Sequence, residues 1–143
     1  MENFTNQTAI ELPLKIKTYD IDVAGHVNNI VYIQWLEDLR TSLFEQNFNL
    51  QKLLFSNVYP IVLSTEFNYK KYLTLFDKPV GTMYVERCTH GIFTLKAEVM
   101  HNGRRIAFGT QKCVLFDLAK LEIIKGYRLQ ELLPEYYAQT VPT

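Results

Sequence analysis

Residues 30–48 read IVYIQWLEDLRTSLFEQNF and form the longest helical pattern in the chain. Their apolar side chains recur at three and four spacing, which places one set on a single helix face: Tyr32, Trp35, Leu36, Leu39 and Leu43. Ile33 and Phe44 widen this stripe, so we expect a helix that is covered on more than one side. Asn28 precedes the stripe and offers a polar side chain to cap the helix.

Before and after this helix, apolar residues recur at every second position, which is typical of strands. Alternation over residues 12–18 predicts one half-buried strand before the helix. Four more strands are predicted after it, at 61–69, about 80–89, 92–101 and 104–116. One strand, a long helix and four further strands together predict an α+β domain.

The connections between these elements carry their own signals. His90-Gly91 and Asn102-Gly103 separate the last three strands, and Asn-Gly is the strongest short signal for a hairpin. Residues 47–60 predict a connection that Pro60 closes, with a short turn of helix inside it. A short helix is predicted at 128–133, before Pro134.

Length and composition exclude several classes of protein. The 143 residues fit one domain, which we expect over 1–143 with its core at about 10–135, and 48% hydrophobic residues exclude a disordered chain. No run approaches the roughly 18 apolar residues of a membrane span. The N-terminus lacks the basic start and apolar core of a signal peptide, so we expect a cytoplasmic protein. Fifteen basic and fifteen acidic residues balance, which does not favour a nucleic-acid partner.

The cysteines and histidines also lack metal or disulfide patterns. Cys88 and Cys113 fall inside apolar runs without a CxxC spacing, so we expect buried thiols in a reducing compartment. The three histidines do not have metal-ligand spacing, and no metal is expected.

Residues 19–29 read YDIDVAGHVNN and gather polar chemistry immediately before the long helix. Two carboxylates, an imidazole and two carboxamides lie next to a helix N-terminus, whose unpaired N–H groups favour an anion or a developing oxyanion. Gly25 permits a positive φ. The same residue types are also favoured in turns and caps, so a purely structural role is the alternative.

The chain resembles the hotdog-fold acyl-CoA thioesterases of the 4-hydroxybenzoyl-CoA thioesterase-like family, through the motif Asp20-x-Asp22-x-x-Gly25-His26-Val27-Asn28-Asn29-x-x-Tyr32 followed by Trp35-Leu36-Glu37-x-x-Arg40. The element order agrees with that family over residues 10–135. This resemblance implies a hotdog fold, in which a five- to six-stranded antiparallel sheet wraps the long helix. It also implies a homodimer, or a dimer of dimers, with active sites at the subunit interface.

The resemblance further implies roles for individual residues. Asp22 falls on the family's catalytic carboxylate, which acts as nucleophile or as general base. His26 and Asn28 match positions that orient the carboxylate, the water or the acyl carbonyl. The N–H groups of Asn29 and Ile30 would bind the thioester oxygen. Asp20 alternates with Asp22 and is expected to point the other way, in a structural role.

Other residues are secondary candidates. Tyr32 and Trp35 lie on the apolar stripe and would line either the core or an acyl pocket. Glu37 is expected to form an ion pair with Arg40, three positions along the helix. Because some family members place the catalytic carboxylate elsewhere, Glu37 and Glu66 are reserve carboxylates.

Coenzyme A needs cations near its phosphates, and the chain offers two basic pairs, although each residue could also be ordinary surface charge: Lys70, Lys71, Arg104 and Arg105. One position departs from the family. Where relatives often have Tyr-x-x-Pro, this chain has Tyr69-Lys70-Lys71-Tyr72, which puts Tyr72 in place of Pro.

These observations predict an enzyme that hydrolyses an acyl-CoA to free acid and CoA, without metal or cofactor beyond the CoA of the substrate. A thioesterase acting on acyl-ACP is one alternative, since only the carrier differs. A non-catalytic protein that binds acyl thioesters is the alternative from another class. Neither the acyl group nor the mode of action of Asp22 follows from the sequence.

Overall fold

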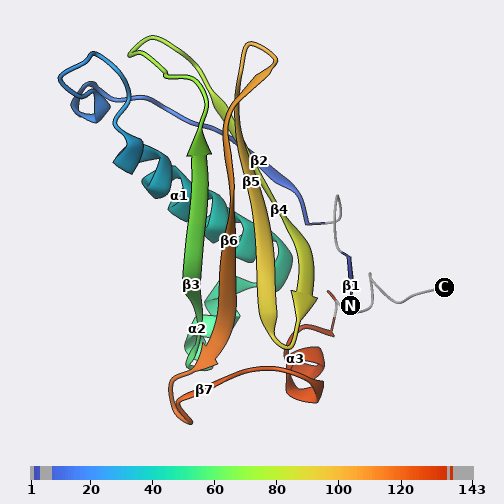
Figure 1. Cartoon of the computed structure of the whole chain (residues 1–143). Helices are drawn as coiled ribbons and strands as arrows, with labels where there is room; N and C mark the ends of the chain where they lie inside the picture. The colour runs from blue at the N-terminus through green and yellow to red at the C-terminus, as the bar shows by residue number, and fades with distance from the viewer. Residues whose placement is uncertain (1, 4–7, 135, 137–143) are drawn as a thin grey trace.

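The central element of the computed structural model is one long helix, α1 (Asn29–Phe48), which lies against a curled antiparallel sheet (Figure 1). The model describes residues 2–3, 8–134 and 136, so the ends of the predicted domain lie outside the described residues. The predicted apolar stripe of α1 is buried throughout, as are Val31 and Phe44. Ile30 and Ile33 are exposed, so the expectation of cover on that side of the helix is wrong for the single chain.

The sheet follows the strand order β1–β4–β5–β6–β3, with β2 also on β4 and β7 on β6, and every pairing is antiparallel. Its longest strands are β3 (Val58–Tyr69), β4 (Val80–Thr89), β5 (Ile92–His101) and β6 (Arg104–Asp117). Short strands complete it: β1 (Glu2–Asn3), β2 (Ile10–Pro13) and β7 (Glu122–Ile123). Five strands of four residues or more around one helix confirm the predicted hotdog arrangement.

Three strands of this sheet form the meander that the turn residues predicted. His90 and Gly91 have φ of 54° and 80°, and Asn102 and Gly103 have φ of 51° and 74°. Two successive positive φ values define the hairpin turn whose twist matches that of the flanking strands. The predicted strand bounds over 80–116 are therefore correct to within one residue.

The ends of two other strands differ from the prediction. β2 stops at Pro13, although Leu14 and Ile16 remain buried and Lys15 and Lys17 exposed as the alternation indicated. β3 begins at Val58, so Pro60 lies inside a strand instead of closing a connection. An edge strand tolerates proline, because the missing N–H can face outward.

Two short helices complete the described chain. The helix α2 (Leu50–Phe55) follows α1 directly, after a left-handed residue at Asn49. The helix α3 (Tyr127–Leu132) lies at the opposite end of the sheet from the 20–28 loop (Figure 1) and ends before Pro134, as predicted. No described helix is long and apolar enough to cross a membrane.

Two apolar clusters form the core, one toward each end of α1. The first surrounds Tyr32 and Trp35 near the start of the helix, and the second surrounds Phe44 and Phe93 near its end. Cys88 and Cys113 are buried and form no disulfide, as predicted. Burial raises the pKa of the Cys113 thiol to about 12, so that thiol is unreactive at neutral pH.

Candidate active site

The loop between η1 (Thr18–Asp20) and α1 folds back on itself as a small closed turn. Ile21 and Val27 form an antiparallel bridge, and the Asp22 N–H donates to the His26 carbonyl at 2.8 Å. Gly25 closes the turn with φ of +80° and donates its N–H to the Asp22 carbonyl at 3.0 Å. The loop is therefore fixed by hydrogen bonds between backbone atoms, which do not involve the side chains at its tip.

The Asp22 carboxylate sits on this turn and is exposed. Its Oδ1 accepts hydrogen bonds from the backbone N–H groups of Ala24 at 2.9 Å and of His26 at 3.2 Å. Its Oδ2 receives no hydrogen bond from a described residue. One oxygen thus fixes the orientation of the carboxylate, while the other stays available to a ligand or a water molecule.

Asp20 has the opposite environment, as expected, but strand alternation is not the reason, since residues two apart in a strand share a face. The 3-10 turn η1 directs Asp20 inward. Asp20 is buried, and its Oδ2 accepts the Lys17 N–H at 2.8 Å. Its carbonyl accepts the Asn28 N–H at 2.8 Å, which joins η1 to the residue that caps α1. Asp20 therefore supports the loop from within and does not face the same side as Asp22.

The N-terminus of α1 offers fewer free donors than the sequence suggested. Asn28 is the N-cap, and its Oδ1 accepts the Ile30 N–H at 3.1 Å. The N–H groups of Asn28 and Ile30 are thus both occupied. The Asn29 N–H donates no hydrogen bond to a described residue, so of the N–H groups predicted to bind an oxyanion this is the one that is free to do so.

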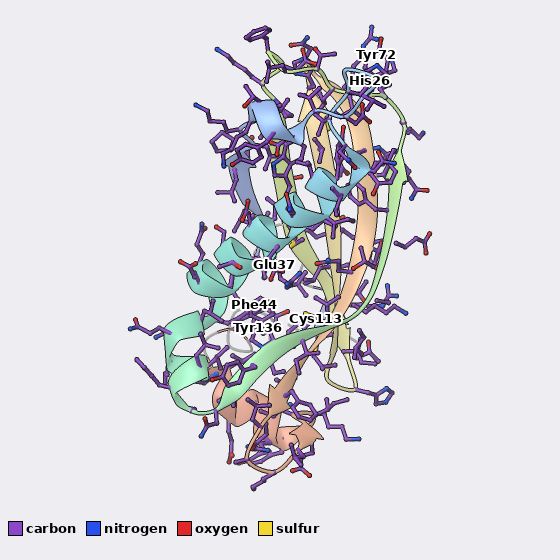
Figure 2. The ribbon with its side chains drawn as sticks, turned by 90° about the vertical axis from the view of Figure 1, so that its left-hand side faces the viewer. His26, Glu37, Phe44, Tyr72, Cys113 and Tyr136 are labelled. Atoms are coloured by element: carbon purple, nitrogen blue, oxygen red, sulfur yellow. The ribbon has the colours of Figure 1, made fainter. Side chains whose placement is uncertain are left out.

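His26 is oriented by a residue from a distant segment. Its imidazole stacks on the Tyr72 ring, with the centroids 3.8 Å apart and the planes 9° from parallel. The two side chains lie together at the end of the molecule where the loop meets the sheet (Figure 2). The next residue of the loop is fixed by the same segment, since the Val27 N–H donates to the Leu73 carbonyl at 2.8 Å.

Tyr69 is a second aromatic residue near α1 that the sequence analysis did not assign. Its hydroxyl donates to the Asn29 carbonyl at 3.3 Å, and its ring meets that of Tyr32 edge to face. The only signal in the sequence was the departure at Tyr69–Tyr72 from the Tyr-x-x-Pro pattern, which marked this segment as unusual without showing what it contacts.

Tyr32 and Trp35 belong to the core. Both are almost fully buried, and their rings pack edge to face with centroids 5.1 Å apart. Burial, with smaller effects from Tyr69 and Asp77, raises the pKa of Tyr32 to about 12. The sequence left two alternatives for these side chains, the core or the lining of an acyl pocket. In the single chain they pack in the core.

The helix carboxylate Glu37 forms the predicted ion pair with Arg40. Arg40 also donates to Oε1 of the buried Gln111 at 2.9 Å, and Gln111 donates to the Thr65 hydroxyl at 3.1 Å. Burial lowers the pKa of the Arg40 guanidinium. The pair therefore anchors α1 to β6 and β3, while Glu37 itself remains exposed.

The basic residues suggested for phosphate binding come together where β3 ends and β6 begins. Lys70 Nζ lies 5.4 Å, and the Arg105 guanidinium carbon 4.0 Å, from the centroid of the Phe108 ring. The N–H groups of Lys70 and Lys71 both donate to the Ile106 carbonyl. Arg104 is exposed at the start of β6, so all four cations occupy one end of the sheet.

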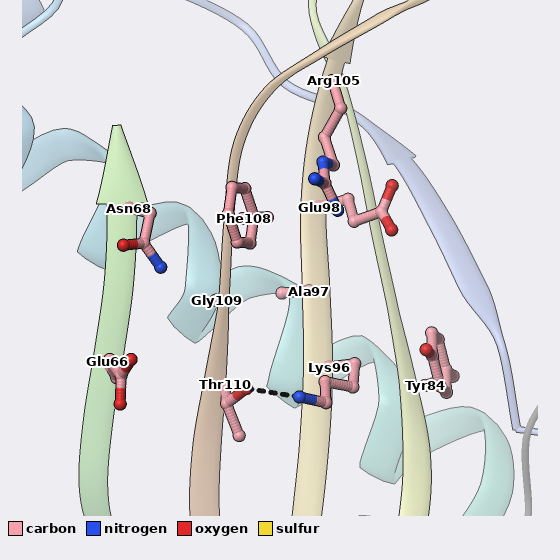
Figure 3. Close-up of a pocket in the computed structure, with 10 residues that line it drawn as sticks. All are labelled: Glu66, Asn68, Tyr84, Lys96, Ala97, Glu98, Arg105, Phe108, Gly109 and Thr110. Carbon is pink, nitrogen blue, oxygen red and sulfur yellow. Dashed lines mark hydrogen bonds between the residues drawn. The ribbon is translucent and has the colours of Figure 1, made fainter. Parts of the chain in front are cut away.

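Glu66 lies away from the Asp22 loop, on the face of the sheet that points away from α1. It lines a depression of about 370 Å³ together with Arg105 and Lys96, whose ammonium group donates to the Thr110 hydroxyl at 3.0 Å (Figure 3). The structure of the single chain does not bring Glu66 together with the Asp22 loop.

An apolar groove of about 840 Å³ lies between residues 13–18 and 75–80. Leu14, Leu75 and Val80 contribute apolar walls, and three lysines stand around it: Lys15, Lys17 and Lys78. The two segments that form the groove are chain neighbours of those that form the loop and the His26 stack. Among the described residues, no three His, Cys, Asp or Glu side chains are grouped as metal ligands would be.

Comparison with known proteins agrees with this geometry. The family model of the thioesterase-like superfamily matches residues 16–139. The chain belongs to this superfamily. The protein is a thioester hydrolase with the hotdog fold.

Individual relatives of this thioesterase are distant. The long-chain acyl-CoA thioesterase FadM of Escherichia coli strain K12 is 29% identical over 111 residues, which cover 76% of this chain and 84% of FadM. The probable thioesterase YbaW from Escherichia coli superposes with a TM-score of 0.76 at 23% identity, covering 94% of this chain and 98% of YbaW. The DHNA-CoA thioesterase from Staphylococcus aureus has a TM-score of 0.76 at 18% identity, with 91% and 85% covered.

Proposed function

We propose that this thioesterase hydrolyses acyl-CoA to the free acid and CoA, with Asp22 as the catalytic carboxylate. The observation that supports this most directly is the Asp22 side chain. One of its oxygens is fixed by two backbone N–H groups, and the other accepts no hydrogen bond from a described residue. A fixed, exposed carboxylate can attack a carbonyl or activate water, and a helix N–H can stabilise the oxyanion that develops.

Hydrolysis has two routes, which differ in whether Asp22 Oδ2 attacks the acyl carbon or removes a proton from water. As a nucleophile it forms a bond to the acyl carbon, the C–S bond breaks, CoA leaves as thiolate, and water then hydrolyses the anhydride. As a general base it removes a proton from the water that attacks the same carbon; the C–S bond then breaks, and CoA leaves as a thiolate that takes up a proton. In both routes the carbonyl oxygen gains negative charge, and we assign the Asn29 N–H to stabilise it.

The reaction needs only water as co-reactant, so we propose that no metal or further cofactor takes part. Activity that survives an excess of chelator would support this part of the proposal. Cys88 and Cys113 are buried and form no disulfide, which agrees with a reducing compartment, and we propose that the reaction takes place in the cytoplasm.

The rest of the substrate has two candidate contacts. The cations at the β3 end, Lys70, Lys71, Arg104 and Arg105, would meet the phosphates of CoA. The apolar groove of about 840 Å³ between residues 13–18 and 75–80 has the volume and lining for an aliphatic acyl chain, which favours a medium or long chain over a short one.

We also propose that two copies of the chain pair through β3. No other strand of the described residues pairs with its outer edge, although it is twelve residues long and exposes Ile61 and Leu63. Ile30 and Ile33 of α1 are exposed as well. A long apolar edge of this kind promotes association, and pairing with a second copy would remove it.

The first experiment measures thiol release from short, long and aromatic acyl-CoAs, with Asp22→Asn beside the wild type. The substitution keeps the shape of the side chain and removes its charge. We expect a fall in kcat of about a hundredfold or more, the scale of a lost catalytic group. Asp38→Asn is the matched control, because Asp38 is an exposed carboxylate on α1. It should retain full activity.

Two other results would redirect the proposal. A strong preference for acyl-ACP over the same acyl group on CoA would identify the carrier protein as the natural carrier. An active Asp22→Asn would remove Asp22 from the chemistry and leave Glu37 and Glu66 as the carboxylates to test.

The dimer is tested by the molar mass in solution. Leu63→Lys places a charge on the open edge of β3 and should yield monomers, whereas Leu118→Lys, at another exposed leucine, should not. A monomeric wild type would contradict the pairing. An active Leu63→Lys monomer would show that each site is complete within one chain.

A further inference from the structure

The orientation of the His26 ring depends on one aromatic neighbour. Its stack on Tyr72 is close and nearly parallel, with 3.8 Å between centroids and 9° between planes. Neither ring nitrogen of His26 forms a hydrogen bond with a described residue. A histidine ring in an active site is usually oriented by a hydrogen bond to one of its nitrogens. Here the flat contact with Tyr72 takes that place.

The stack restricts where the two imidazole nitrogens can point. Both nitrogens lie in the plane of the ring, so a parallel neighbour directs them along the Tyr72 surface and never into it. The backbone on both sides of the ring is also held by hydrogen bonds. The His26 N–H donates to Asp22 Oδ1 at 3.2 Å, and the Val27 N–H donates to the Leu73 carbonyl at 2.8 Å.

Apart from this contact, Tyr72 contributes little to the packing of the fold. Its side chain is 65% exposed, so it contributes little to the core. It also occupies the position where the resembling family often has Pro, which lacks an aromatic face. Its exposure and its contact with His26 point to a role at the loop.

We propose that Tyr72 is a positioning residue, which sets the plane of the His26 imidazole relative to the Asp22 carboxylate. This inference rests on the proposed function, since it assigns His26 a place in that site. The hydroxyl of Tyr72 is not needed for the role, because only the ring face touches His26. Phenylalanine should therefore replace it, and alanine or proline should not.

The first test is spectroscopic and needs no substrate. The Tyr72 ring should displace the proton resonances of the His26 ring upfield by its ring current. We expect that displacement in the wild type and in Tyr72→Phe, and its loss in Tyr72→Ala and Tyr72→Pro. Identical His26 resonances in the wild type and in Tyr72→Ala would show that the stack does not exist in solution, and the inference would be wrong.

The second test is kinetic and uses a double-mutant cycle. Tyr72→Ala should lower kcat on the best acyl-CoA by about three- to tenfold, the range expected for loss of one aromatic contact, with little change in KM. Tyr72→Phe should restore kcat. In a His26→Ala background, Tyr72→Ala should have no further effect, because the ring that it positions is gone.

Tyr127→Ala provides the matched control, since Tyr127 is exposed at the start of α3, far from the loop. It should change neither kcat nor the His26 resonances. The thermal midpoint of each variant separates positioning from unfolding, and we expect Tyr72→Ala to shift it by no more than Tyr127→Ala does.

With an active wild type, three kinetic outcomes would overturn the role of Tyr72. A rise in KM at constant kcat would make Tyr72 a substrate contact. An unchanged kcat in Tyr72→Ala, with an active wild type, would refute the inference and leave the proposed function intact. Equal losses in the presence and absence of His26 would show that Tyr72 acts by another path. A wild type inactive on every thioester would instead contradict the proposed function, and the positioning role with it.

Discussion

Both ends of α1 pack into an apolar cluster, but only the N-terminal end also carries an exposed polar loop. At its C-terminal end, Phe44 and Phe48 pack against Phe93 and Tyr136, with ring centroids between 4.6 and 6.2 Å apart. At its N-terminal end, Asn28 caps the helix and an exposed polar loop lies beside it. Figure 2 shows the two ends well separated, with Phe44 and Tyr136 in one region and His26 and Tyr72 in the other.

The packed end of the helix therefore mainly supports stability, and the polar end lies beside the residues proposed for catalysis. Apolar packing is strong and tolerates no solvent, so it suits an end that never opens to a ligand. Hydrogen bonds between backbone and short polar side chains fix geometry without covering the surface, so they suit an end that meets a substrate. Substitutions at the packed end should therefore change unfolding alone, and those at the polar end should change catalysis as well as stability.

The largest expected effect is at the packed end. Phe93→Ala removes a fully buried ring and should lower the free energy of unfolding by about 3–5 kcal/mol. Urea denaturation followed by circular dichroism measures the loss. Below the transition, kcat per folded molecule should equal that of the wild type. A parallel fall in kcat would show that the two ends are coupled through α1.

Asp20→Ala tests whether a buried carboxylate at the polar end supports both stability and catalysis. The variant leaves the Lys17 N–H without its acceptor, which should cost about 1–3 kcal/mol, and it loosens the loop that carries Asp22. We expect both the unfolding midpoint and kcat to fall. Asp38→Ala, an exposed carboxylate on α1, should affect neither. If kcat stays constant in Asp20→Ala, the loop keeps its shape through backbone bonds alone.

The cap of α1 should contribute less. Asn28→Ala removes the acceptor of the Ile30 N–H and should cost about 1 kcal/mol of stability. Asn28→Ser keeps a capping oxygen and should lie close to the wild type in thermal denaturation. Equal stability of the two variants would mean that the cap does not fix this end of the helix.

The smallest effect depends on pH and involves Asp117, at the end of β6. A hydrogen bond from Arg128, then those from the Lys120 and Ala119 N–H groups, lowers the pKa of this carboxyl. Because the folded-state pKa lies below the unfolded value of about 3.9, the stabilisation is present above that pH and is lost as the pH falls through the folded-state value.

The thermal midpoint of the wild type should therefore fall more steeply than that of Asp117→Asn when the pH is lowered from about 6 to 3. The difference should amount to a few degrees, and activity at neutral pH should be the same in both proteins. Parallel pH curves would indicate that the Arg128 contact contributes nothing in solution.

Local patterns were sufficient for much of the fold and for the composition of the site. The stripe of α1, the two hairpins and the strands over 80–116 depend on residues within a few positions of one another. The Asp22 turn is local in the same sense, because its hydrogen bonds span four residues or fewer. The opposite environments of Asp20 and Asp22 do not follow from a period of two, which places residues two apart on one face. They arise because Asp20 ends the 3-10 turn η1, whereas Asp22 lies in the exposed loop after it.

Other features were not visible in the sequence, since they depend on contacts between distant segments. The bulge between Val62 and Ser64 of β3 changed which side chains are exposed, and it arises from pairing with β6. The Arg40–Gln111 bond joins residues 71 positions apart, and the Tyr69–Asn29 bond joins residues 40 apart. No local pattern specifies such pairs.

By itself the sequence determined the elements, their order and the polar loop before α1, because helix and strand periods and turn residues act over a few positions. Only the tertiary structure decided which donors at the start of α1 stay free, which edge of the sheet stays open, and that Tyr72 covers His26. Those outcomes depend on how the segment after β3 meets the loop, and they follow from packing of the whole sheet around one helix.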